Sequence, residues 1–527
     1  MTIDREETVH VLDESSSRFE NAASAGLADR VWAIFDNPIF VKHRRTRLRK
    51  SLITAPLAVV FVICILIAYS GYSFQGFTNG MVFSLTMIFQ AILLAVIGAT
   101  QIGSSVGAAR ESGIIDYHRV SPLSPLSLVL GFFFGAPVRE YAMYAMTLPL
   151  ALICIFNEAP GALGFFEATV ALFLSAWTMH ALALLTSLST KKPKAGGRGV
   201  IGLVIFVAMF GGNAGIFVFR SAATSLNTGL KMGFFGIDIH WLLFTTLYTA
   251  PFLFFVLLAS VRKMRSERAH PFTKPEAIGA IALLAFLLIG AVWGSPALVP
   301  TAITVLYVMV ATSCVLITTV TPNQSEFAKG VRRALKEGRG SLGPWSDWAI
   351  NRATVLVLAA ILLLAGTIVT QALPESPGGR NFFNSYSPPE FSLSITVATS
   401  VFVVIYVGLA FQAFHLLMAK RASTMFALFL FMVWVVPLLV GAISGASGID
   451  EGIASFIASL SPIAGISLSA GISGLDSTRL LQAGAFCPAI FFAFVFNNLV
   501  MVSKRRLEKK IRDSEEKPEE KPVALEV

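Results

Sequence analysis

The feature that most constrains this chain is a series of long apolar segments, each long enough to cross a membrane. A spanning helix needs about 20 predominantly apolar residues, and twelve segments of the sequence meet this requirement. Their length and their lack of strict alternation favour helices over the strands of a membrane barrel. The segments are 52–70, 82–109, 139–157, 163–190, 199–220, 241–261, 276–293, 299–320, 353–373, 393–418, 423–445 and 481–502.

The composition excludes the alternatives to a membrane protein. Of the 527 residues, 55% are hydrophobic and only 14% are charged, whereas soluble domains average about 25% charged residues. A soluble chain this apolar would lack the polar surface to cover its cores, and a disordered chain needs the opposite composition. We therefore expect an all-α polytopic membrane protein that passes through the cell (inner) membrane many times and has the lipid bilayer as a partner.

The basic residues predict the orientation of these helices. An even number of spans places both termini on one side of the membrane. If that side is the cytoplasm, 36 of the 41 Lys and Arg residues fall in cytoplasmic loops and tails, as the known bias of membrane proteins requires. The net charge of +10 is then an orientation signal, and nucleic acid is not an expected partner.

The order of the loops predicts two six-helix halves of the same orientation, which is a parallel repeat. Each half begins with two spans and a charged cytoplasmic loop, at 110–125 in the first half and at 321–352 in the second. Each ends with two spans around a longer outer segment and then a basic exit. The predicted domains are a cytoplasmic tail with an amphipathic elbow at 1–51, six-helix halves at 52–268 and 269–503, and a charged cytoplasmic tail at 504–527.

Amphipathic sequence precedes the first apolar segment. Over 27–35 apolar residues recur on one helical face, as expected of a helix lying in the membrane interface. Asn37 and Pro38 then have the pattern of an N-cap and a first helical turn, and we expect that helix to continue to Lys50. This elbow is either a positive stop at the membrane or a contact for a cytoplasmic partner. Its candidate residues are Val31, Phe35, Pro38, Lys42 and Arg44.

The loop after the second span is charged and rich in residues that fix the backbone. Gly113 is expected to end or bend a helix, and two prolines break the chain again. A short structure of fixed geometry just outside the bilayer can transmit a displacement. The candidate coupling residues are Arg110, Glu111, Gly113, Asp116, Arg119, Pro122 and Pro125.

This loop resembles the coupling region of type-2 ABC exporter permeases. That family has a basic residue followed by Glu, any residue, Gly and Thr, and later Pro-Leu-Ser. Arg110, Glu111 and Gly113 match the first part and 122–124 match the second, while Ile114 stands where the family usually has Thr. The resemblance extends over about 27–265, because the elbow and the six-span plan also agree.

The resemblance implies a transmembrane permease subunit of an ATP-driven transporter, and more specifically of an exporter. A separate cytoplasmic ABC ATPase subunit would bind ATP and Mg and dock on the elbow and the coupling loop. Its closure would push both, so that the halves rock between inward and outward states. A second permease chain is a further candidate partner. The outer segments 221–240 and 446–480 would close the outer end, and we expect short re-entrant helices in the second of them.

The residues themselves agree with an ATPase on another chain. The dipeptide Gly-Lys never occurs, so this chain has no phosphate-binding loop of the Gly-x-x-x-x-Gly-Lys type. We expect no catalytic residue, no metal ligand and no cofactor in it, and hence no enzyme. The second half departs from the family, since 321–352 lacks Pro-Leu-Ser and has a basic amphipathic segment at 325–337 instead. That half either docks an ATPase as well or supports a partner permease as a degenerate copy.

Few ionisable residues fall within the predicted spans. Arg139 and Glu140 are a candidate gate or an interfacial pair, and we expect no salt bridge between them because neighbours on a helix do not face each other. Glu167 is expected to be solvated, and His180 and His415 to be hydrogen-bonded core residues. An ion-coupled secondary transporter, which needs such buried groups, and a non-transporting membrane scaffold are the competing functions.

Overall fold

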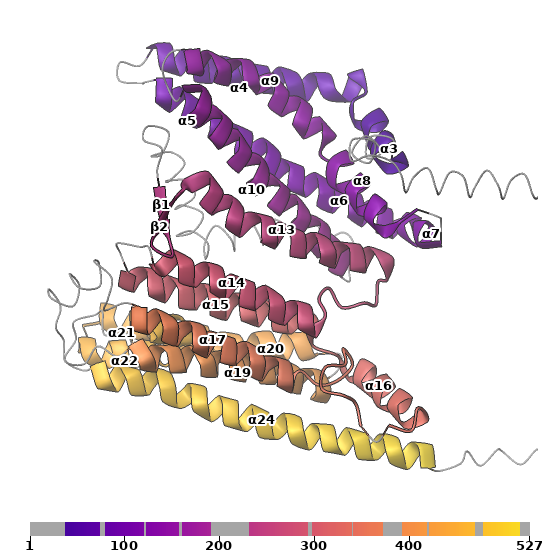
Figure 1. Cartoon of the computed structure of the whole chain (residues 1–527), viewed down its shortest axis with the longest axis vertical. Coiled ribbons are helices and arrows are strands. Elements are labelled where there is room, and N and C mark those ends of the chain that lie inside the picture. Colours follow the sequence, from indigo (N-terminus) through magenta and orange to yellow (C-terminus); the bar gives the residue numbers. More distant parts are fainter. Residues whose placement is uncertain are drawn as a thin grey trace, which may run out of the picture. The chain divides into compact units, whose positions relative to one another are not determined.

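The computed structural model describes residues 37–73, 79–120, 123–156, 161–190, 231–293, 298–339, 341–372, 393–418, 421–448, 450–468 and 478–516. These residues form helices joined by turns, together with a single two-stranded hairpin (Figure 1). Within them, ten helices are long and apolar enough to cross a membrane, or eleven if the bent pair α22–α23 counts as one span. The chain therefore has the architecture of an all-α, multi-pass membrane protein.

Ten of the twelve predicted segments correspond to these candidate spans. The segment 139–157 is helical as α9 (Val138–Phe156), although α9 is not among the ten. The segment 199–220 lies outside the described residues. Twelve spans, and the side on which the termini lie, stay predictions.

Exposure of apolar side chains distinguishes peripheral helices from central ones. In α4 (Lys50–Ser73) only 6% of the most apolar window is buried, and Phe61 and Leu66 are more than half exposed. Each Å² of such surface costs about 25 cal/mol in water, whereas lipid tails are as apolar as leucine. The surface of α4 therefore suits lipid. In α19 (Leu393–Leu417) 67% of the window is buried, so this helix is central to its bundle.

The chain divides into two compact units, 1–230 with 249–269 and 231–248 with 270–527. In the first unit α4, α5 and α9 pack together, η1 and α6 pack on α10, and α3 lies on α8 (Figure 1). One core cluster fills the space between α3, α6, α8 and α10 and includes Ile39, Ile102 and Leu184. The helices of this unit not yet delimited are α3 (Pro38–Arg47), α5 (Asn79–Ala91), the π-helix η1 (Ile92–Gly98), α6 (Ala99–Glu111), α7 (Ile114–Val120), α8 (Pro125–Gly135) and α10 (Gly161–Ser189).

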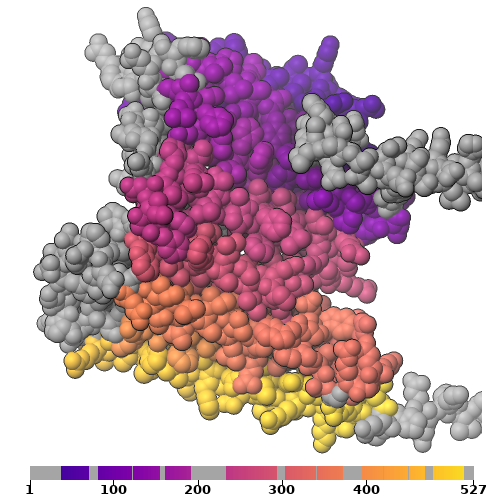
Figure 2. Space-filling model, viewed as in Figure 1, coloured from indigo at the N-terminus to yellow at the C-terminus, as the bar shows by residue number. Residues whose placement is uncertain are grey.

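In the second unit α19 packs against α15, α17, α20 and α24. The long helix α24 remains exposed along much of its length and forms the yellow strip in Figure 2. The elements of this unit are β1 (Lys231–Phe234), β2 (Ile237–His240), α14 (Lys274–Trp293), α15 (Leu298–Val320), α16 (Gln324–Lys336), α17 (Arg352–Ala372), α20 (Ala422–Leu430), the π-helix η3 (Phe431–Val435), α21 (Val436–Ala446), α22 (Glu451–Ser459), α23 (Pro462–Leu468) and α24 (Thr478–Glu516). The helix α13 (Trp241–Arg265) contributes to both units.

The hairpin lies at 231–240, the described part of the predicted outer segment 221–240. Strands β1 and β2 are antiparallel, with Lys231 opposite His240 and Phe234 opposite Ile237. Phe235 and Gly236 form the turn with φ angles of 49° and 78°, as two-residue hairpin turns require. The backbone N–H of Phe235 donates to the carbonyl of Gly290 on α14 at 3.0 Å, which attaches the hairpin to that helix.

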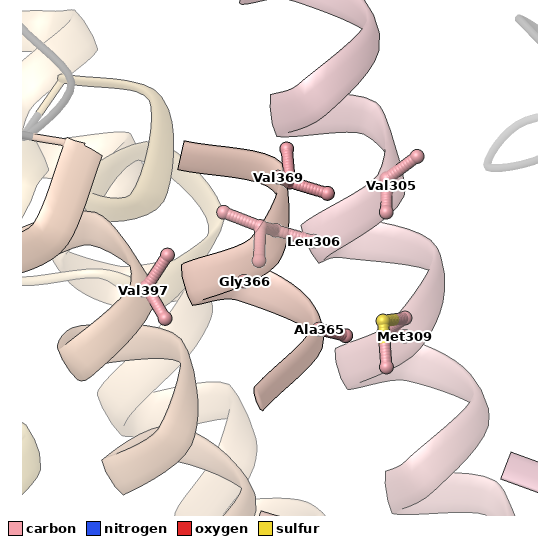
Figure 3. Close-up of a pocket in the computed structure, with 7 residues that line it drawn as sticks. All are labelled: Val305, Leu306, Met309, Ala365, Gly366, Val369 and Val397. Atoms are coloured by element: carbon pink, nitrogen blue, oxygen red, sulfur yellow. The ribbon is translucent and has the colours of Figure 1, made fainter. Parts of the chain in front are cut away.

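Small residues allow the helices of the second unit to approach closely. A Cβ on Gly366 of α17 would overlap the side chain of Val397 on α19. A gap of only about 10 Å³ remains there, and Figure 3 shows that apolar side chains of α15, α17 and α19 surround it. A gap of this volume with no polar lining is a packing defect and not a binding site.

Two local expectations can be compared directly with the helices. The helix expected to run from Asn37 to Lys50 is interrupted, because α3 ends at Arg47 and α4 begins at Lys50. The expectation was wrong because the backbone leaves the helical conformation at Leu48, with φ of −94° and ψ of 17°, after its N–H has made the last i→i−4 bond to Arg44. Short helices were expected in 446–480, and α22 and α23 lie there with a bend of 120° between them.

Candidate functional site

The predicted coupling loop folds into a helix–turn–helix made of α6 and α7. Gly113 between them has a φ of 71°, the left-handed conformation that glycine adopts without strain. The N–H of Gly113 donates to the carbonyl of Arg110 at 3.1 Å, and that of Ser112 to Ala108 at 3.0 Å. The end of α6 is therefore closed by its own backbone, and the chain reverses at a defined angle.

Arg110 connects this turn to two other helices. Its Nη1 donates to the carbonyls of Ser187 and Thr190, at 2.8 and 2.6 Å, at the end of α10. Its Nη2 donates to Oε1 of Glu267, in the turn after α13, at 2.8 Å. The last carbonyls of a helix lack partners within the helix, so the guanidinium caps α10 while its charge meets a carboxylate.

Arg119 connects α7 to the end of α13. Its Nε donates to the carbonyl of Met264 at 3.0 Å, and its Nη2 to that of Lys263 at 3.3 Å. Its Nη1 pairs with Asp116 and lies 3.9 Å from Oε2 of Glu267. Both arginines of the predicted site thus converge on Glu267, a residue that the sequence did not single out.

The opposite face of α7 carries exposed side chains. Tyr117 and Val120 are 70% and 84% exposed, and Glu111 and Asp116 are exposed as well. The arginines therefore serve internal contacts, whereas the tip of the turn presents an aromatic, an aliphatic and two acidic side chains.

The structure describes one of the two prolines of the predicted loop. Pro122 lies outside the described residues. Pro125 is the first residue of α8, after Ser124, whose hydroxyl accepts from the N–H of Ser127 at 3.1 Å. This is the N-cap and N1 pattern that starts helices.

The elbow helix α3 is docked on α8 by a buried asparagine. Asn37 Oδ1 caps α3 by accepting from the N–H of Ile39 at 3.0 Å, and its Nδ2 donates to the carbonyl of Ser127 at 2.6 Å and to the hydroxyl of Ser127 at 2.9 Å. A Cβ on Gly131 would lie 2.8 Å from Asn37 Oδ1, and one on Gly135 would lie 3.0 Å from the Cα of Phe40. The two glycines therefore make the close contact of α3 and α8 possible.

Arg47 attaches the other end of α3 to α6. Its guanidinium donates to Gln101 Oε1 at 2.5 Å and to Ser105 Oγ at 2.7 Å. Pro38, Lys42 and Arg44 are exposed, so the predicted elbow residues face outward. Val31 and Phe35 lie outside the described residues.

Two histidines of this region are shifted toward the neutral form. Burial lowers the pKa of His43 to about 4, and the positive charges of Arg47 and Lys42 act in the same direction. The ring of His43 packs edge-on against Phe132 of α8, with 5.6 Å between centroids. Burial also lowers the pKa of His118, with Lys42 as the second cause.

The predicted gate pair has a different geometry from the one expected. Arg139 donates from Nη2 and Nε to Glu140 Oε1 at 2.9 and 3.2 Å, so the expectation of no salt bridge was wrong. The long arginine side chain folds back onto its neighbour because Glu140 is fully buried and a buried carboxylate needs a partner. Glu140 and Arg139 also act electrostatically on Arg47, which places the pair near the elbow. Glu167 is only 6% exposed, so the expectation of a solvated carboxylate was wrong too.

Both intramembrane histidines are hydrogen-bonded, as expected. His180 has no exposed surface, and its Nε2 lies 2.8 Å from the carbonyl oxygen of Leu94 in η1. His415 is half-buried, and its Nδ1 lies 2.9 Å from the carbonyl of Phe411.

The charged loop of the second half forms the amphipathic helix expected from its sequence. Helix α16 starts with a capping box, in which the Asn323 side chain accepts from the N–H of Glu326 and Glu326 Oε2 accepts from the N–H of Asn323. Its buried face includes Phe327 and Gly330, and a Cβ on Gly330 would lie 2.7 Å from the Cβ of Trp348. The segment after α16 therefore folds back over the helix.

A buried lysine holds that segment in place. Lys274, the first residue of α14, is fully buried, and its Nζ donates to the carbonyls of Ser346 and Ala349 at 2.7 Å. The carbonyls of Pro344 and Ile350 complete the cage at 3.1 and 3.4 Å. The sequence placed Lys274 among the cytoplasmic charges and did not indicate this role, because its partners are backbone atoms about 70 residues away.

Within the described residues no group of three or more His, Cys, Asp or Glu side chains is placed to hold a metal ion. The candidate functional features are the fixed turn α6–α7, the elbow helix α3 docked on α8, and the buried Lys274 with its carbonyl partners. Comparisons with models of known protein families, with curated proteins and with solved structures find no match to this chain.

Proposed function

We propose that this protein is the transmembrane permease subunit of an ATP-driven transporter of the type-2 ABC kind, acting as an exporter in the inner membrane with both termini in the cytoplasm. The observation that carries the proposal is the α6–α7 turn. Its inner face is attached to α10 and α13 through Arg110 and Arg119, and its outer face is open at Tyr117 and Val120. A partner ATPase would bind that outer face.

The geometry supports transmission of force from this turn into the bilayer. The helix α6 is continuous with η1 and α5, and the three together form the candidate span Met81–Glu111. A displacement at Gly113 therefore acts directly on a membrane helix. The arginine contacts carry the same displacement to α10 and α13, both of which are candidate spans. Such a rigid, multiply attached element suits a mechanical coupling role.

The elbow offers a second route. Helix α3 contacts α8 through Asn37 and α6 through Arg47, while Lys42 and Arg44 are exposed to a cytoplasmic partner. The second half would receive the partner differently, through the basic face of α16, on which Lys329 and Lys336 are exposed. ATP and Mg would be bound by the partner chain.

The test is purification of the tagged full-length protein from its native membranes in a mild detergent, followed by mass spectrometry and ATPase assay. We expect a phosphate-loop ATPase to copurify. The substitution Val120→Asp should lower its yield about tenfold, which corresponds to 1.4 kcal/mol. Ile237→Asp is the matched control, because Ile237 is also a largely exposed aliphatic residue, at 67%, and belongs to β2 and not to the α6–α7 turn. Glu111→Ala and Gly113→Pro should leave insertion intact and uncouple transport from ATP hydrolysis.

An ion-coupled secondary transporter is the second candidate, and buried Glu140 favours it. A carboxylate inside a membrane bundle is costly and often marks an ion path. In that case the reconstituted protein alone would transport under a proton or sodium gradient without any ATPase. Full transport activity of the isolated chain would rule out the permease proposal.

A further inference from the structure

The second candidate span contains an irregular turn at its centre. Residues Ile92–Gly98 form the π-helix η1 between α5 and α6. π-Turns are rare and are found mostly as single insertions within α-helices, frequently at functional sites. Because a π-turn holds one more residue than an α-turn, it determines how α6 is rotated relative to α5.

His180 of α10 contacts this turn directly. Its Nε2 lies 2.8 Å from the carbonyl oxygen of Leu94, and neither residue has exposed surface. A carbonyl oxygen can only accept, so Nε2 bears the hydrogen and donates it. The Nδ1 atom is then the acceptor, and the hydroxyl of Tyr141 on α9 lies 3.4 Å from it. Three helices thus meet at one imidazole.

Gly98 at the end of η1 makes room for this ring. A Cβ at this position would lie 2.6 Å from His180 Nε2 and 3.5 Å from the Cβ of Pro137. No side chain other than hydrogen leaves space for the hydrogen bond to Leu94. The imidazole and the glycine are therefore complementary parts of one contact.

The second unit has a comparable arrangement. Trp434 lies in the π-helix η3, and its carbonyl accepts from the hydroxyl of Ser461 in the turn between α22 and α23. Its Nε1 donates to Tyr406 Oη at 2.6 Å. In both units a carbonyl of the π-turn is bound by a side chain from another segment, which is the kind of partner that such a turn needs.

We propose that His180 is a positioning residue: its hydrogen bond to Leu94 holds η1 as a wide turn and thereby sets the rotation of α6. Conversion of η1 to regular α-helix would turn α6 by about 100° and shift it by about 1.5 Å per residue. Gln101 would leave Arg47, and Arg110 would leave the carbonyls of α10. The coupling role of α6 rests on the proposed function, whereas the effect of His180 on helix register does not.

The experiment measures register by cross-linking two cysteine pairs in the full-length protein in detergent, without any ATPase. The four native cysteines are replaced by alanine. The pair Arg47→Cys with Gln101→Cys reports on α6, beyond η1. The pair Gln90→Cys with Thr147→Cys is the matched control on the other side of η1, where the native side chains are hydrogen-bonded at 2.7 Å. A short bifunctional thiol reagent joins each pair.

We expect His180→Leu to lower the 47–101 cross-link about fivefold, because a turn of 100° separates the two positions, and to leave the 90–147 cross-link within about twofold of the native yield. His180→Gln should restore the 47–101 yield, since its amide can donate to Leu94. Gly98→Ala, which displaces the ring, should act like His180→Leu and serves if that variant does not fold.

Either of two results would overturn the proposal. One is an unchanged 47–101 yield in a folded His180→Leu or Gly98→Ala protein. The other is an equal loss in both pairs, which would mean general loosening and only a packing role for His180. Neither cross-linking yield depends on ATP or cargo. The role of His180 in helix register can therefore be confirmed even if the permease proposal fails, and the permease proposal can hold even if His180 has no such role.

Discussion

Arg110 and Glu267 are 157 residues apart in the sequence, yet Arg110 Nη2 lies 2.8 Å from Glu267 Oε1. The two side chains differ in burial, since 11% of the arginine side chain and 58% of the glutamate side chain are exposed. The buried arginine also donates to the carbonyls of Ser187 and Thr190, whereas the largely exposed glutamate carboxylate meets Arg110 and, at 3.9 Å, Arg119. Arg110 therefore contributes more to the stability of this region than Glu267 does.

Because of this asymmetry, we expect substitution of Arg110 to lower the stability of the protein more than substitution of Glu267. Arg110→Met should destabilise the protein by about 2 kcal/mol, because buried carbonyls at the end of α10 lose a charged donor. Glu267→Gln should cost less than about 1 kcal/mol, as exposed ion pairs do. Thermal unfolding in one detergent, followed by tryptophan fluorescence, compares them. Equal losses would show that the ion pair, and not the cap, carries the stability.

We expect substitution of Gly113 to lower stability through backbone conformation alone. No atom lies within 4 Å of a Cβ built at this position, so Gly113→Ala introduces no clash, but φ is +71°. The substitution should cost about 1 kcal/mol through left-handed strain, and Gly113→Asn should cost less. Gly279 on α14 is the control, because it is also free of clashes and Gly279→Ala should stabilise an ordinary helix by about 1 kcal/mol. A neutral Gly113→Ala in the same unfolding assay would contradict the role of the turn.

His43 predicts a pH dependence of elbow docking. Its pKa is about 4 in the folded protein and 6.5 ordinarily. Since the folded value is lower, the unfolded state binds more protons between these values, so docking should be constant above about pH 6.5 and weaken as the pH falls toward 4. Hydroxyl-radical footprinting of the buried residues Ile39 and Phe40 across this range measures it. His43→Gln removes the titration, and an identical profile in that variant would refute the assignment.

We expect substitution of the buried Lys274 to lower the stability of the protein strongly, although lysine is usually a surface residue. Lys274→Met removes the ammonium donor from the carbonyls of Pro344, Ala349 and Ile350 and one of the two donors to Ser346, whose carbonyl still accepts from the N–H of Ala349. The substitution should cost about 3 kcal/mol. Lys329→Met is the matched control, because Lys329 lies exposed on α16 and should change stability by less than about 0.5 kcal/mol. Hydrogen exchange of 324–350 should increase only in the first variant. Similar exchange in both would exclude the cage as a stabilising element.

Much of the helix plan could be predicted because it depends on local composition. Segments of about 20 apolar residues are helical in a membrane whatever their neighbours, since the backbone must satisfy its own hydrogen bonds there. The end of α6 at Gly113 was expected because it too depends on local sequence. Pro125 was expected only to break the chain, and the capping box of α16 at Asn323 was not predicted, although both act within a few residues. The hairpin at 231–240 was not predicted, because two four-residue strands carry almost no periodic signal.

The partners of the site residues could not be predicted in this way. Asn37 was expected only as an N-cap, and it also binds Ser127. Arg139 was expected not to meet Glu140, because helix periodicity ignores how a long side chain bends toward a buried charge. The involvement of Glu267 and Lys274 depends on segments that meet only in the folded protein.

The sequence by itself therefore determined the membrane class, most of the helices and the turns that glycine, proline and capping residues set, because these follow from interactions within a few residues. Only the tertiary structure decided which polar groups meet across helices: Arg110 with Glu267, Arg47 with Gln101, and His180 with the π-turn at Leu94. The physical reason is that a buried polar group must find a partner wherever the packing places one. Packing between helices is a property of the whole bundle and not of any one segment.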